Sequence, residues 1–460
     1  MSALWTSEAI AHAVGGTARG TFVASGVSID SRAIAKGDLF VALKGPNFDG
    51  ADFVESALAQ GAAGAITTRV GEGPLILVPD TLAALEALGR ASRTRTKAAI
   101  VAVTGSVGKT STKEMLRLAL TPFGSVHASA GNLNNHWGAP LSLARMPEQS
   151  AFGIFELGMN HAGEIAPLSR LVRPHVAIVT EVAAAHLAFF DSVAAIARAK
   201  AEIFAGMEGG AAILPADNPH LAILVEGAQR AGITDIRLFG TAEHAAIRLL
   251  DCAADPAGQA IRFRLDGRDH RFTMRAHGAH LARNALAVIG AVAVLGFDCR
   301  RALDALGQFT ALPGRGGRRH IPLARGQGEI VLIDESYNAS PASMRAALQV
   351  LGDAWQAKRR IAILGDMREL GVQADALHAD LAEDIRAAGI DKVFLCGSHM
   401  AHLWRRLPEN IRAAYGAQSV DLAEPVRAAV QGGDWVLVKG SLGSAMAPLA
   451  KTIEELGDAV

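Results

Sequence analysis

The stretch TGSVGKTST, Thr104 to Thr112, brings glycine, lysine and hydroxyl side chains together directly after an apolar segment. Glycines let backbone N–H groups approach phosphate oxygens closely, and the positive end of a following helix attracts the same anion. The Lys109 ammonium group can neutralise β- and γ-phosphate charge, and the Thr110 hydroxyl group suits a magnesium ion. Val103 occupies the outer glycine position of the full G-x-x-x-x-G-K-T pattern, so the match is incomplete by one residue. We predict a nucleotide site here, and the alternative is an ordinary turn between a strand and a helix.

Two residues suited to a metal ion follow later apolar segments. Glu156 ends FGIFELG, and His186 lies just beyond HVAIVTEV. Phosphoryl transfer needs a metal ion as well as a phosphate cradle, and the carboxyl ends of parallel strands meet at one edge of a sheet. Both residues are therefore candidate metal ligands, although a paired carboxylate and a hydrogen-bonded loop histidine would produce the same pattern. Lys200, in IARAKAEIF, has by composition only the features of a lysine on a helix surface.

The elements that must position these side chains are strands alternating with helices. From Ala98 onward apolar segments alternate with helical ones, which predicts a parallel sheet. Residues 237–276 change to short segments separated by turn residues, as in an antiparallel appendage. A break at ALPGRGGRRH precedes a second apolar series, EIVLIDE, RRIAILGD, KVFLCG and WVLVKG. The first eighty or so residues indicate a small α/β unit, with a predicted helix in FVESALAQGAAGA. Its boundary is predicted in the polar, helix-prone connection from Leu82 to Lys97.

Composition restricts the class of protein further. The 460 residues contain 45 Lys and Arg against 45 Asp and Glu, so there is no basic field for a nucleic acid, which we do not expect as a partner. The longest apolar run, Ala285 to Phe297, is too short to span a bilayer, and residues 1–16 lack a basic leader with a continuous apolar segment. We therefore expect a cytoplasmic protein without membrane insertion. Cys252, Cys299 and Cys396 lack metal-ligand spacing, which predicts buried free thiols.

Seven motifs together suggest a family. They occur in the order TGSVGKTSTKEM, GNLNNHWGAPLSL, FELGMNHAGEI, HLARNALA, LPGRGGR, DESYNASPASM and ILGDMRELG, over nearly the whole chain. This series resembles the Mur ligases, and DESYNASP with LGDMRELG is typical of the members that add the dipeptide D-alanyl-D-alanine. The resemblance implies an α/β fold of three domains: a small N-terminal α/β domain for a UDP sugar (1–85), a central P-loop-type ATPase domain with a parallel sheet (86–312) and a C-terminal Rossmann-like domain (313–460).

The resemblance also implies a reaction. The substrates would be the small molecules UDP-N-acetylmuramoyl-tripeptide and D-alanyl-D-alanine, with ATP and Mg²⁺ as cofactors. In this family the tripeptide carboxylate attacks the γ-phosphate of ATP, and the dipeptide amine then displaces phosphate from the acyl phosphate. A monomer whose C-terminal domain closes on the nucleotide is expected. Diaminopimelate and lysine both remain candidates for the third residue of the peptide.

By the same resemblance, most of the predicted nucleotide and metal site falls on the first motifs. The implied phosphate cradle is Gly105, Ser106, Val107, Gly108, Lys109, Thr110 and Ser111. Implied metal ligands are Thr110, Glu156, His186 and Lys200, the last as a carbamate. The implied catalytic residues are Lys109, Lys200, His186 and Arg315, of which Arg315 also faces the nucleotide. Asn284 matches the position that contacts adenine, and Asp334 the position that holds the ribose and phosphate region.

Substrate residues are implied at both ends of the chain. Asn134 and Asn135 resemble the loop that orients the muramoyl group, and Tyr337 with Asn338 lies near the incoming dipeptide. The UDP group is expected at Ser31, Arg32, Lys44 and Asp49. The family commonly has histidine where Ala51 stands, which is a departure in this nucleotide contact.

Two other functions fit parts of the pattern. Another Mur-type ligase, or one resembling the folylpolyglutamate synthases, would use the same phosphate loop with a different amino acceptor. A nucleotide-dependent switch or chaperone would need neither a UDP-sugar domain nor metal residues placed for acyl activation. The ligase that adds the dipeptide is therefore the favoured interpretation.

Overall fold

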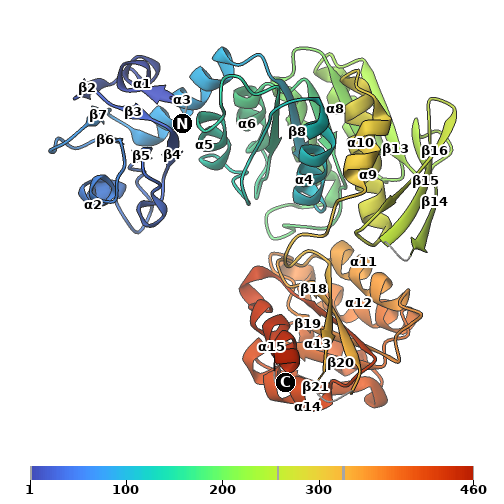
Figure 1. Ribbon diagram of the computed structural model, residues 1–460. Coiled ribbons are helices and arrows are strands. Elements are labelled where there is room, and N and C mark those ends of the chain that lie inside the picture. Colours follow the sequence, from blue (N-terminus) through green and yellow to red (C-terminus); the bar gives the residue numbers. More distant parts are fainter. Residues whose placement is uncertain (1–2, 256–257, 324–326, 459–460) are drawn as a thin grey trace.

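Within the described residues, three large β-sheets follow one another along the chain, and a separate two-stranded antiparallel sheet of β1 and β3 lies in the N-terminal region. The computed structural model describes residues 3–255, 258–323 and 327–458. Figure 1 shows the N-terminal sheet (blue) and the C-terminal sheet (orange to red) each beside the central one, and not beside one another. This arrangement is the three-domain α/β architecture that the sequence predicts.

The N-terminal sheet has the strand order β2-β7-β6-β5-β4, with β2 antiparallel and the others parallel. The elements of this region are β1 (Trp5–Thr6), α1 (Ser7–Val14), β2 (Thr17–Arg19), β3 (Val23–Ala24), β4 (Gly26–Ser28), β5 (Asp38–Val41), α2 (Val54–Ala59), β6 (Gly64–Thr67), β7 (Leu75–Leu77) and α3 (Thr81–Arg95). The helix predicted in FVESALAQGAAGA is shorter than expected, because it ends at Ala59 and the following alanines lead into β6.

Helix α3 connects the first sheet to the second. The Asp80 carboxylate begins the helix by accepting the N–H groups of Leu82 and Ala83. Leu85 and Leu88 on this helix are fully buried and share one apolar core with the N-terminal sheet and with α5 of the central domain. The connection from Leu82 to Lys97 is helical as far as Arg95, as the sequence predicts, and it packs against both the N-terminal sheet and α5.

The central sheet has nine strands in the order β16-β15-β14-β13-β12-β11-β8-β10-β9. Its elements are β8 (Ala99–Thr104), α4 (Lys109–Leu120), β9 (Val126–Ala128), α5 (Gly138–Ala144), β10 (Phe152–Glu156), α6 (Ile165–Val172), β11 (Val176–Val179), α7 (Val193–Ala201), β12 (Ala211–Pro215), α8 (Leu221–Arg230), β13 (Asp235–Gly240), β14 (Ile247–Asp255), β15 (Gly258–Leu265), β16 (Arg268–Met274), α9 (Ala279–Val294) and α10 (Cys299–Leu306). Apolar cores cover both of its faces.

The antiparallel appendage begins one strand later than the sequence indicates. Strand β13, which contains RLF, pairs in parallel with β12 and with β14, so it belongs to the parallel part of the sheet. A helical crossover through α8 brings β13 back alongside β12 in this direction. The antiparallel pairs described in this sheet are β14 with β15 and β15 with β16, in the region where the short alternating segments predict them.

The C-terminal sheet has six strands in the order β17-β18-β22-β19-β20-β21, with β17 antiparallel at one edge. Its elements are β17 (Gly317–Pro322), β18 (Glu329–Glu335), α11 (Pro341–Gly352), β19 (Arg359–Gly365), α12 (Ala374–Ala387), β20 (Lys392–Cys396), α13 (Met400–Arg406), β21 (Arg412–Gly416), α14 (Ala423–Ala429), β22 (Asp434–Lys439) and α15 (Ala447–Asp458). Two apolar cores, one on each face, consist only of residues of this region.

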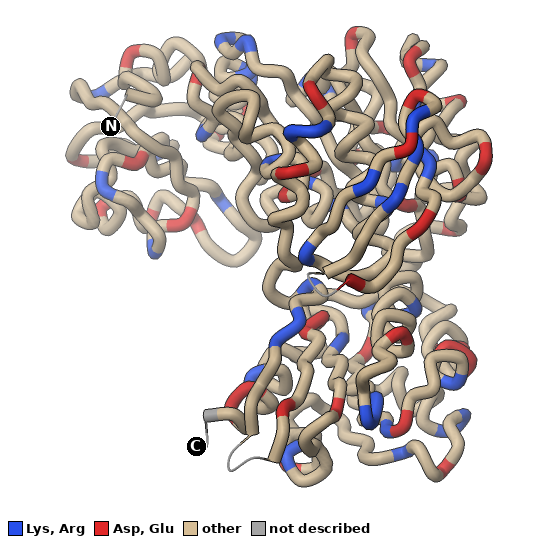
Figure 2. The backbone as a smooth tube through the Cα atoms, turned by 45° about the vertical axis from the view of Figure 1, so that its right-hand side comes forward, with Lys and Arg blue, Asp and Glu red and all other residues tan. Residues whose placement is uncertain are grey.

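Charged residues are spread over all three regions. Figure 2 shows blue and red segments interspersed along the tube in each part of the molecule. Within the described ranges, no helix combines the length and the apolar composition needed to cross a membrane. The three cysteines are free; Cys252 and Cys299 are half-buried, whereas Cys396 is buried.

Candidate active site

A cleft of about 640 Å³ lies between the carboxyl ends of the central strands and the C-terminal domain. We call it the interdomain cleft. Residues from the phosphate loop, β10, α9 and the start of the C-terminal domain line it, as parallel α/β sheets favour. The cleft brings together these residues predicted from the sequence: Ser106, Val107, Gly108, Lys109, Thr110, Ser111, Asn134, Glu156, His186, Asn284, Arg315, Tyr337 and Asn338.

The phosphate loop depends on two glycines. Gly105 and Gly108 have φ angles of 150° and 85°, and a Cβ atom added to Gly105 would lie 2.0 Å from Thr180 Oγ1. The Ser106 N–H group donates to the Glu181 carbonyl at 2.7 Å, which fixes the loop against the end of β11. Helix α4 starts directly after Gly108 without a side-chain cap, so its first N–H groups are available to an anion.

Lys109 folds back over this loop. Its Nζ atom donates to the Gly105 carbonyl at 2.7 Å. Burial lowers the pKa of Lys109, and nearby Arg315 acts in the same direction, whereas Glu156 opposes the shift. An anion such as a nucleotide phosphate would favour the charged form of this amine. The position of Lys109 therefore suits a cation that binds phosphate.

Glu156 and Thr110 form the most enclosed polar contact in the cleft. The Thr110 hydroxyl group donates to Glu156 Oε2 at 2.9 Å, and Asn134 Nδ2 donates to Oε1 at 2.9 Å. Glu156 is only 3% exposed, and Lys113 Nζ lies 4.0 Å from Oε2. A carboxylate and a hydroxyl oxygen side by side suit Mg²⁺, which takes oxygen ligands and keeps several waters or phosphate oxygens.

The described residues do not include a ready-made protein cage for a metal ion. Across residues 3–255, 258–323 and 327–458, no group of three or more His, Cys, Asp or Glu side chains is arranged to hold one. A magnesium ion at Thr110 and Glu156 would therefore obtain most of its ligands from phosphate and water. The residues fit an ion that enters with a nucleotide.

Lys200 is buried rather than on a helix surface. It lies on α7, is 1% exposed and has no hydrogen-bond or ion-pair partner within the described chain. Burial holds the pKa of Lys200 well below its usual value, and Lys109 adds to that shift, while Glu156 opposes it. The environment thus favours the neutral amine, which is the form that reacts with CO₂.

His186 faces the C-terminal domain. Its Nδ1 atom lies 2.5 Å from a carboxylate oxygen of Glu369, and the Ala188 N–H group donates to the Glu369 carbonyl at 3.0 Å. Burial lowers the pKa of His186, and the hydrogen bond with Glu369 opposes that shift. In this arrangement the imidazole links two domains while it lines the same cleft as Thr110 and Glu156.

Residues near the domain boundary approach the cleft from its other side. The Arg315 guanidinium group lies 3.9 Å from the centre of the Tyr337 ring. The Asn338 carbonyl accepts a hydrogen bond from Lys439 Nζ at 3.0 Å. Asn284 on α9 lies against the phosphate loop, because a Cβ atom at Gly108 would be 2.8 Å from its Nδ2 atom. Asn284 therefore contacts the loop, and Arg315 and Tyr337 line the same cleft.

Other predicted site residues lie outside the cleft. The Asp334 carboxylate accepts hydrogen bonds from the N–H groups of Gly314 at 3.2 Å and Ser336 at 3.1 Å, so it holds the domain connection in place. Asn135 lines a second cavity of about 630 Å³ near α3 and α6. Gly105 and Lys200 support the cleft from behind it.

The four residues expected to hold the UDP group all lie in the N-terminal domain, away from the interdomain cleft. Arg32 pairs with Asp30 at 2.8 Å, and Asp49 pairs with Arg69 at 2.6 Å. Lys44 and Asp49 form an isolated antiparallel bridge, and Ser31 begins a short 3₁₀ helix. These residues are grouped in one domain, and their side chains contact neighbouring residues of that domain.

Several cleft residues carry charge and were not predicted as site residues. They are Glu181, Asp217, Arg283, Glu335, Arg368, Glu369 and Lys439. Lys439 is 1% exposed and pairs with Glu335 at 3.0 Å. Arg368 and Glu369 follow β19 within ILGDMRELG, so a charged pair just beyond an apolar segment was the available signal.

Three family models match consecutive parts of the chain. The Mur ligase family catalytic domain matches residues 23–93, the Mur ligase middle domain matches residues 103–292, and the Mur ligase glutamate ligase domain matches residues 319–442. Together they extend over all three sheets.

Similar proteins cover nearly the full length. A UDP-N-acetylmuramoyl-tripeptide--D-alanyl-D-alanine ligase of Rickettsia prowazekii is 33% identical, over 96% of this chain and 97% of that protein. The Escherichia coli protein of the same name is 36% identical, over 94% of each chain. A crystal structure of MurF from Acinetobacter baumannii superposes with a TM-score of 0.86 and 28% identity, over 98% of this chain and 99% of that one. MurF ligase from Thermotoga maritima in complex with ADP gives a TM-score of 0.80 and 26% identity, over 94% and 98%.

Proposed function

The chain belongs to the Mur ligase family, and from this premise we propose how the interdomain cleft carries out its reaction. The enzyme is an ATP-dependent ligase that joins D-alanyl-D-alanine to UDP-N-acetylmuramoyl-tripeptide, giving the pentapeptide precursor of peptidoglycan. The observation that carries the proposal is the convergence of the phosphate loop, the Thr110–Glu156 pair and Arg315 in one cleft.

The first step brings two anions together. The terminal carboxylate of the tripeptide attacks the γ-phosphorus of ATP, and the bond from that phosphorus to the ADP oxygen breaks, which leaves an acyl phosphate and ADP. The first N–H groups of α4 and the Lys109 ammonium group hold the transferred phosphoryl group. Arg315, on the opposite side of the cleft, supplies further positive charge as the two substrates approach.

The second step forms the amide bond. The amine of D-alanyl-D-alanine attacks the carbonyl carbon of the acyl phosphate, and the tetrahedral intermediate collapses. Inorganic phosphate leaves with the C–O electron pair and takes up the proton that the amine nitrogen loses. Lys109 and Arg315 remain beside the departing phosphate and stabilise its charge. Tyr337 and Asn338 lie on the C-terminal side of the cleft, from which we propose that the dipeptide enters.

We further propose that Thr110 and Glu156 hold Mg²⁺ when ATP is bound. That ion supplies charge neutralisation to the phosphates. Lys200 becomes a carbamate, and its new carboxylate-like group faces the same site as Glu156. Its burial and lack of a hydrogen-bond partner support this role. His186 takes part as a ligand only where its contact with Glu369 is released.

The remaining assignments follow the domain plan. We propose boundaries at 1–85, 86–312 and 313–460, with the UDP group at Ser31, Arg32, Lys44 and Asp49 and the adenosine beside Asn284 and Asp334. Asn134 and Asn135 would orient the muramoyl group between them. The enzyme acts as a monomer, and it acts in the cytoplasm. Its use of ATP and its free thiols support the cytoplasmic location.

Phosphate release by the purified protein tests the proposal. The assay contains ATP, Mg²⁺ and UDP-N-acetylmuramoyl-tripeptide, with D-alanyl-D-alanine present or omitted. We expect release that requires both substrates and matches the amount of pentapeptide formed. Release stimulated by a different amino acid would instead indicate another acceptor, and release without the muramoyl peptide would indicate a nucleotide-driven switch.

A further inference from the structure

We propose that the guanidinium group of Arg368 binds the C-terminal carboxylate of the incoming D-alanyl-D-alanine. This inference rests on the proposed function, because it assigns one end of that substrate. The dipeptide must present its amine to the acyl phosphate while its carboxylate keeps a full negative charge. A cation separate from those on the phosphates is therefore needed, and arginine can bind a carboxylate through two parallel hydrogen bonds.

The other cations of the interdomain cleft already have different surroundings. Lys109 lies over the phosphate loop, and Lys439 is buried in an ion pair with Glu335. The Arg315 guanidinium group stacks on Tyr337. Arg283 precedes Asn284 on α9, on the side of the cleft where the nucleotide is proposed. These cations either lie where the nucleotide is proposed to bind or are neutralised by an ion pair within the protein.

Arg368 differs from them in its contacts. Its Nη2 atom donates to the Gly443 carbonyl at 2.7 Å, and no carboxylate within the described chain pairs with it. The residue is exposed and lines the interdomain cleft. A guanidinium group has five N–H donors, so most of them remain available to a ligand.

The position of Arg368 also fits the second step of the reaction. The next residue, Glu369, reaches across to His186 and Ala188 at the end of the central sheet. Arg368 therefore stands on the C-terminal domain at the place where the two domains touch beside the phosphate loop. A dipeptide held there by its carboxylate would direct its amine toward the central domain, where the acyl phosphate forms.

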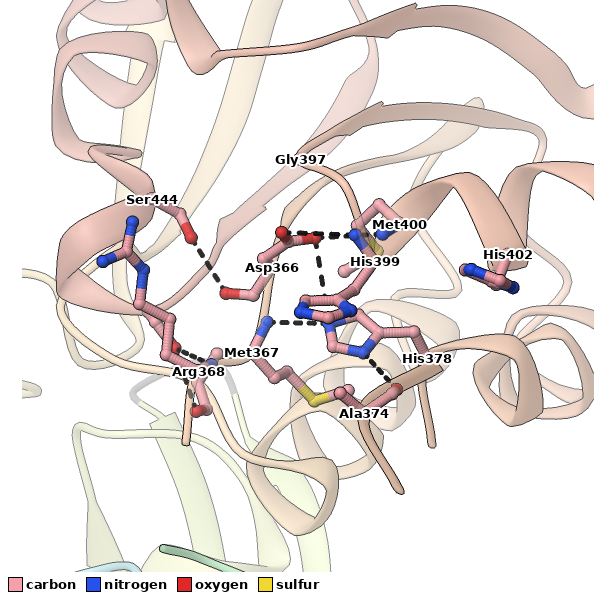
Figure 3. A network of polar contacts seen from close by, with 12 residues as sticks. Asp366, Met367, Arg368, Ala374, His378, Gly397, His399, Met400, His402 and Ser444 are labelled. Carbon is pink, nitrogen blue, oxygen red and sulfur yellow. Dashed lines mark hydrogen bonds and ion pairs between the residues drawn. The ribbon is translucent and has the colours of Figure 1, made fainter. Parts of the chain in front are cut away.

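The backbone that carries Arg368 is held on both sides, as Figure 3 shows. Asp366 accepts the Met400 N–H group at 2.9 Å through its carboxylate, and its carbonyl accepts Ser444 Oγ at 2.9 Å. The Met367 N–H group donates to His378 Nε2 at 2.8 Å, while His378 Nδ1 lies 2.6 Å from the Ala374 carbonyl.

A further bond fixes Arg368 itself, because its own N–H group donates to Ser441 Oγ at 2.9 Å. These bonds come from the ends of β19 and β22 and from the helices that follow β19 and β20. Such support lowers the entropy lost when the side chain engages a ligand. These hydrogen bonds hold the segment rigidly in place, and its two charged residues, Arg368 and Glu369, face the cleft.

Kinetics with a paired change of enzyme and substrate tests the assignment. Arg368→Ala should raise the KM for D-alanyl-D-alanine by about 10- to 100-fold, the range expected for a hydrogen bond to a charged group. The KM values for ATP and UDP-N-acetylmuramoyl-tripeptide should stay within about twofold. With the wild-type enzyme, the dipeptide amide, which lacks the carboxylate charge, should lose a similar factor.

The two losses should not add. Arg368→Ala should use the dipeptide and its amide equally well, because the group that distinguishes them is gone. Arg368→Lys should recover part of the affinity, and Arg386→Ala, an exposed arginine paired with Glu383 on α12, serves as the matched control.

Three results would overturn the inference. They are an unchanged dipeptide KM in Arg368→Ala, an equal rise in the KM for ATP, or full discrimination between dipeptide and amide by the variant. A wild-type enzyme that makes no pentapeptide would instead contradict the proposed function.

Discussion

The Lys200 side chain is 1% exposed, and its amine has no hydrogen-bond partner in the described chain. Because burial favours the neutral form, reaction with CO₂ would exchange an unpaired amine for an anion close to Lys109 and Glu156. The side chain has no evident structural role as a cation.

Replacing Lys200 by alanine should therefore impair the reaction and leave the fold intact. We expect kcat/KM to fall by about 10²- to 10³-fold, a loss comparable to removing a transition-state contact. Added formate or acetate should restore part of the rate by occupying the space of the carbamate. Phosphate release and pentapeptide formation measure both effects.

The control variants separate charge from carbamate. Lys200→Arg keeps a cation but cannot carry the modification, so it should be as inactive as the alanine variant. Lys451→Ala, on α15 and paired with Glu455, should behave as the wild type. An active Lys200→Arg enzyme would exclude the carbamate from the mechanism.

The negative charge of Glu156 is the feature that would bind Mg²⁺. Glu156→Gln retains the size of the side chain and removes its negative charge; its oxygen can still accept from Asn134, while its amide would donate to the Thr110 hydroxyl oxygen. The Mg²⁺ concentration for half-maximal activity should rise by about 10- to 100-fold, the usual loss when a metal site is weakened. Titration of activity with Mg²⁺ measures it, and a variant with wild-type metal dependence would contradict the assignment of Glu156 as a ligand.

How far single residues could be predicted depends on whether their chemistry is local. Thr110 and Glu156 follow strands of one sheet, so the strand pattern was enough to bring them together. The contact between His186 and Glu369 joins positions far apart in the chain and depends on how two domains meet, which no local pattern specifies. Arg368 lies in the motif ILGDMRELG. Only the folded structure shows that no carboxylate within the described chain pairs with it.

On the scale of elements, the turn from β8 into α4 is the most constrained part of the site. Gly108 combines a left-handed φ of 85° with the contact to Asn284, so a side chain there meets both strain and a neighbour. The loop geometry that exposes the first N–H groups of α4 depends on this residue. A side chain at Gly108 would therefore be unfavourable for two separate reasons, the backbone strain and the clash with Asn284.

Gly108→Ala should weaken ADP binding at least about tenfold, because Asn284 and the loop must shift, and tenfold corresponds to about 1.4 kcal/mol. Gly232→Ala is the matched control, since Gly232 has a φ of 79° and open space around it. That control should lose about 1–2 kcal/mol of stability from backbone strain alone and bind ADP normally. Calorimetric titration and thermal unfolding measure the two quantities, and normal ADP binding by Gly108→Ala would count against the cradle.

The order of strands and helices was predictable because each apolar segment is short and the helices between them supply crossovers. Two details were not. The pairing direction of β13 depends on α8, which returns the chain to the same edge of the sheet. Helix α3 has a polar composition, and the sequence does not show which of its faces is buried. That face is defined by packing against α5 and the N-terminal sheet.

For the whole molecule, the two outer domains are attached to the central one in different ways. Leu85 and Leu88 of α3 share an apolar core with Leu141 and Ala144 of α5. Trp5 Nε1 also donates to the Ala144 carbonyl at 2.8 Å in a buried contact. By contrast, the two cores of the C-terminal domain contain only its own residues, and the polar contact between His186 and Glu369 joins this domain to the central one beside the cleft. Separate cores joined through a polar interface favour relative motion of the C-terminal domain.

Substrate binding should therefore compact the molecule by moving the C-terminal domain, while the N-terminal and central domains move as one unit. Small-angle scattering should give a smaller radius of gyration with a non-hydrolysable ATP analogue and UDP-N-acetylmuramoyl-tripeptide than with neither. Glu369→Ala removes the carboxylate that contacts His186, so in the absence of substrates this variant should give a larger radius than the wild type. An unchanged radius with both ligands would contradict closure, and equal radii for the variant and the wild type would show that the His186–Glu369 contact does not hold the domains together.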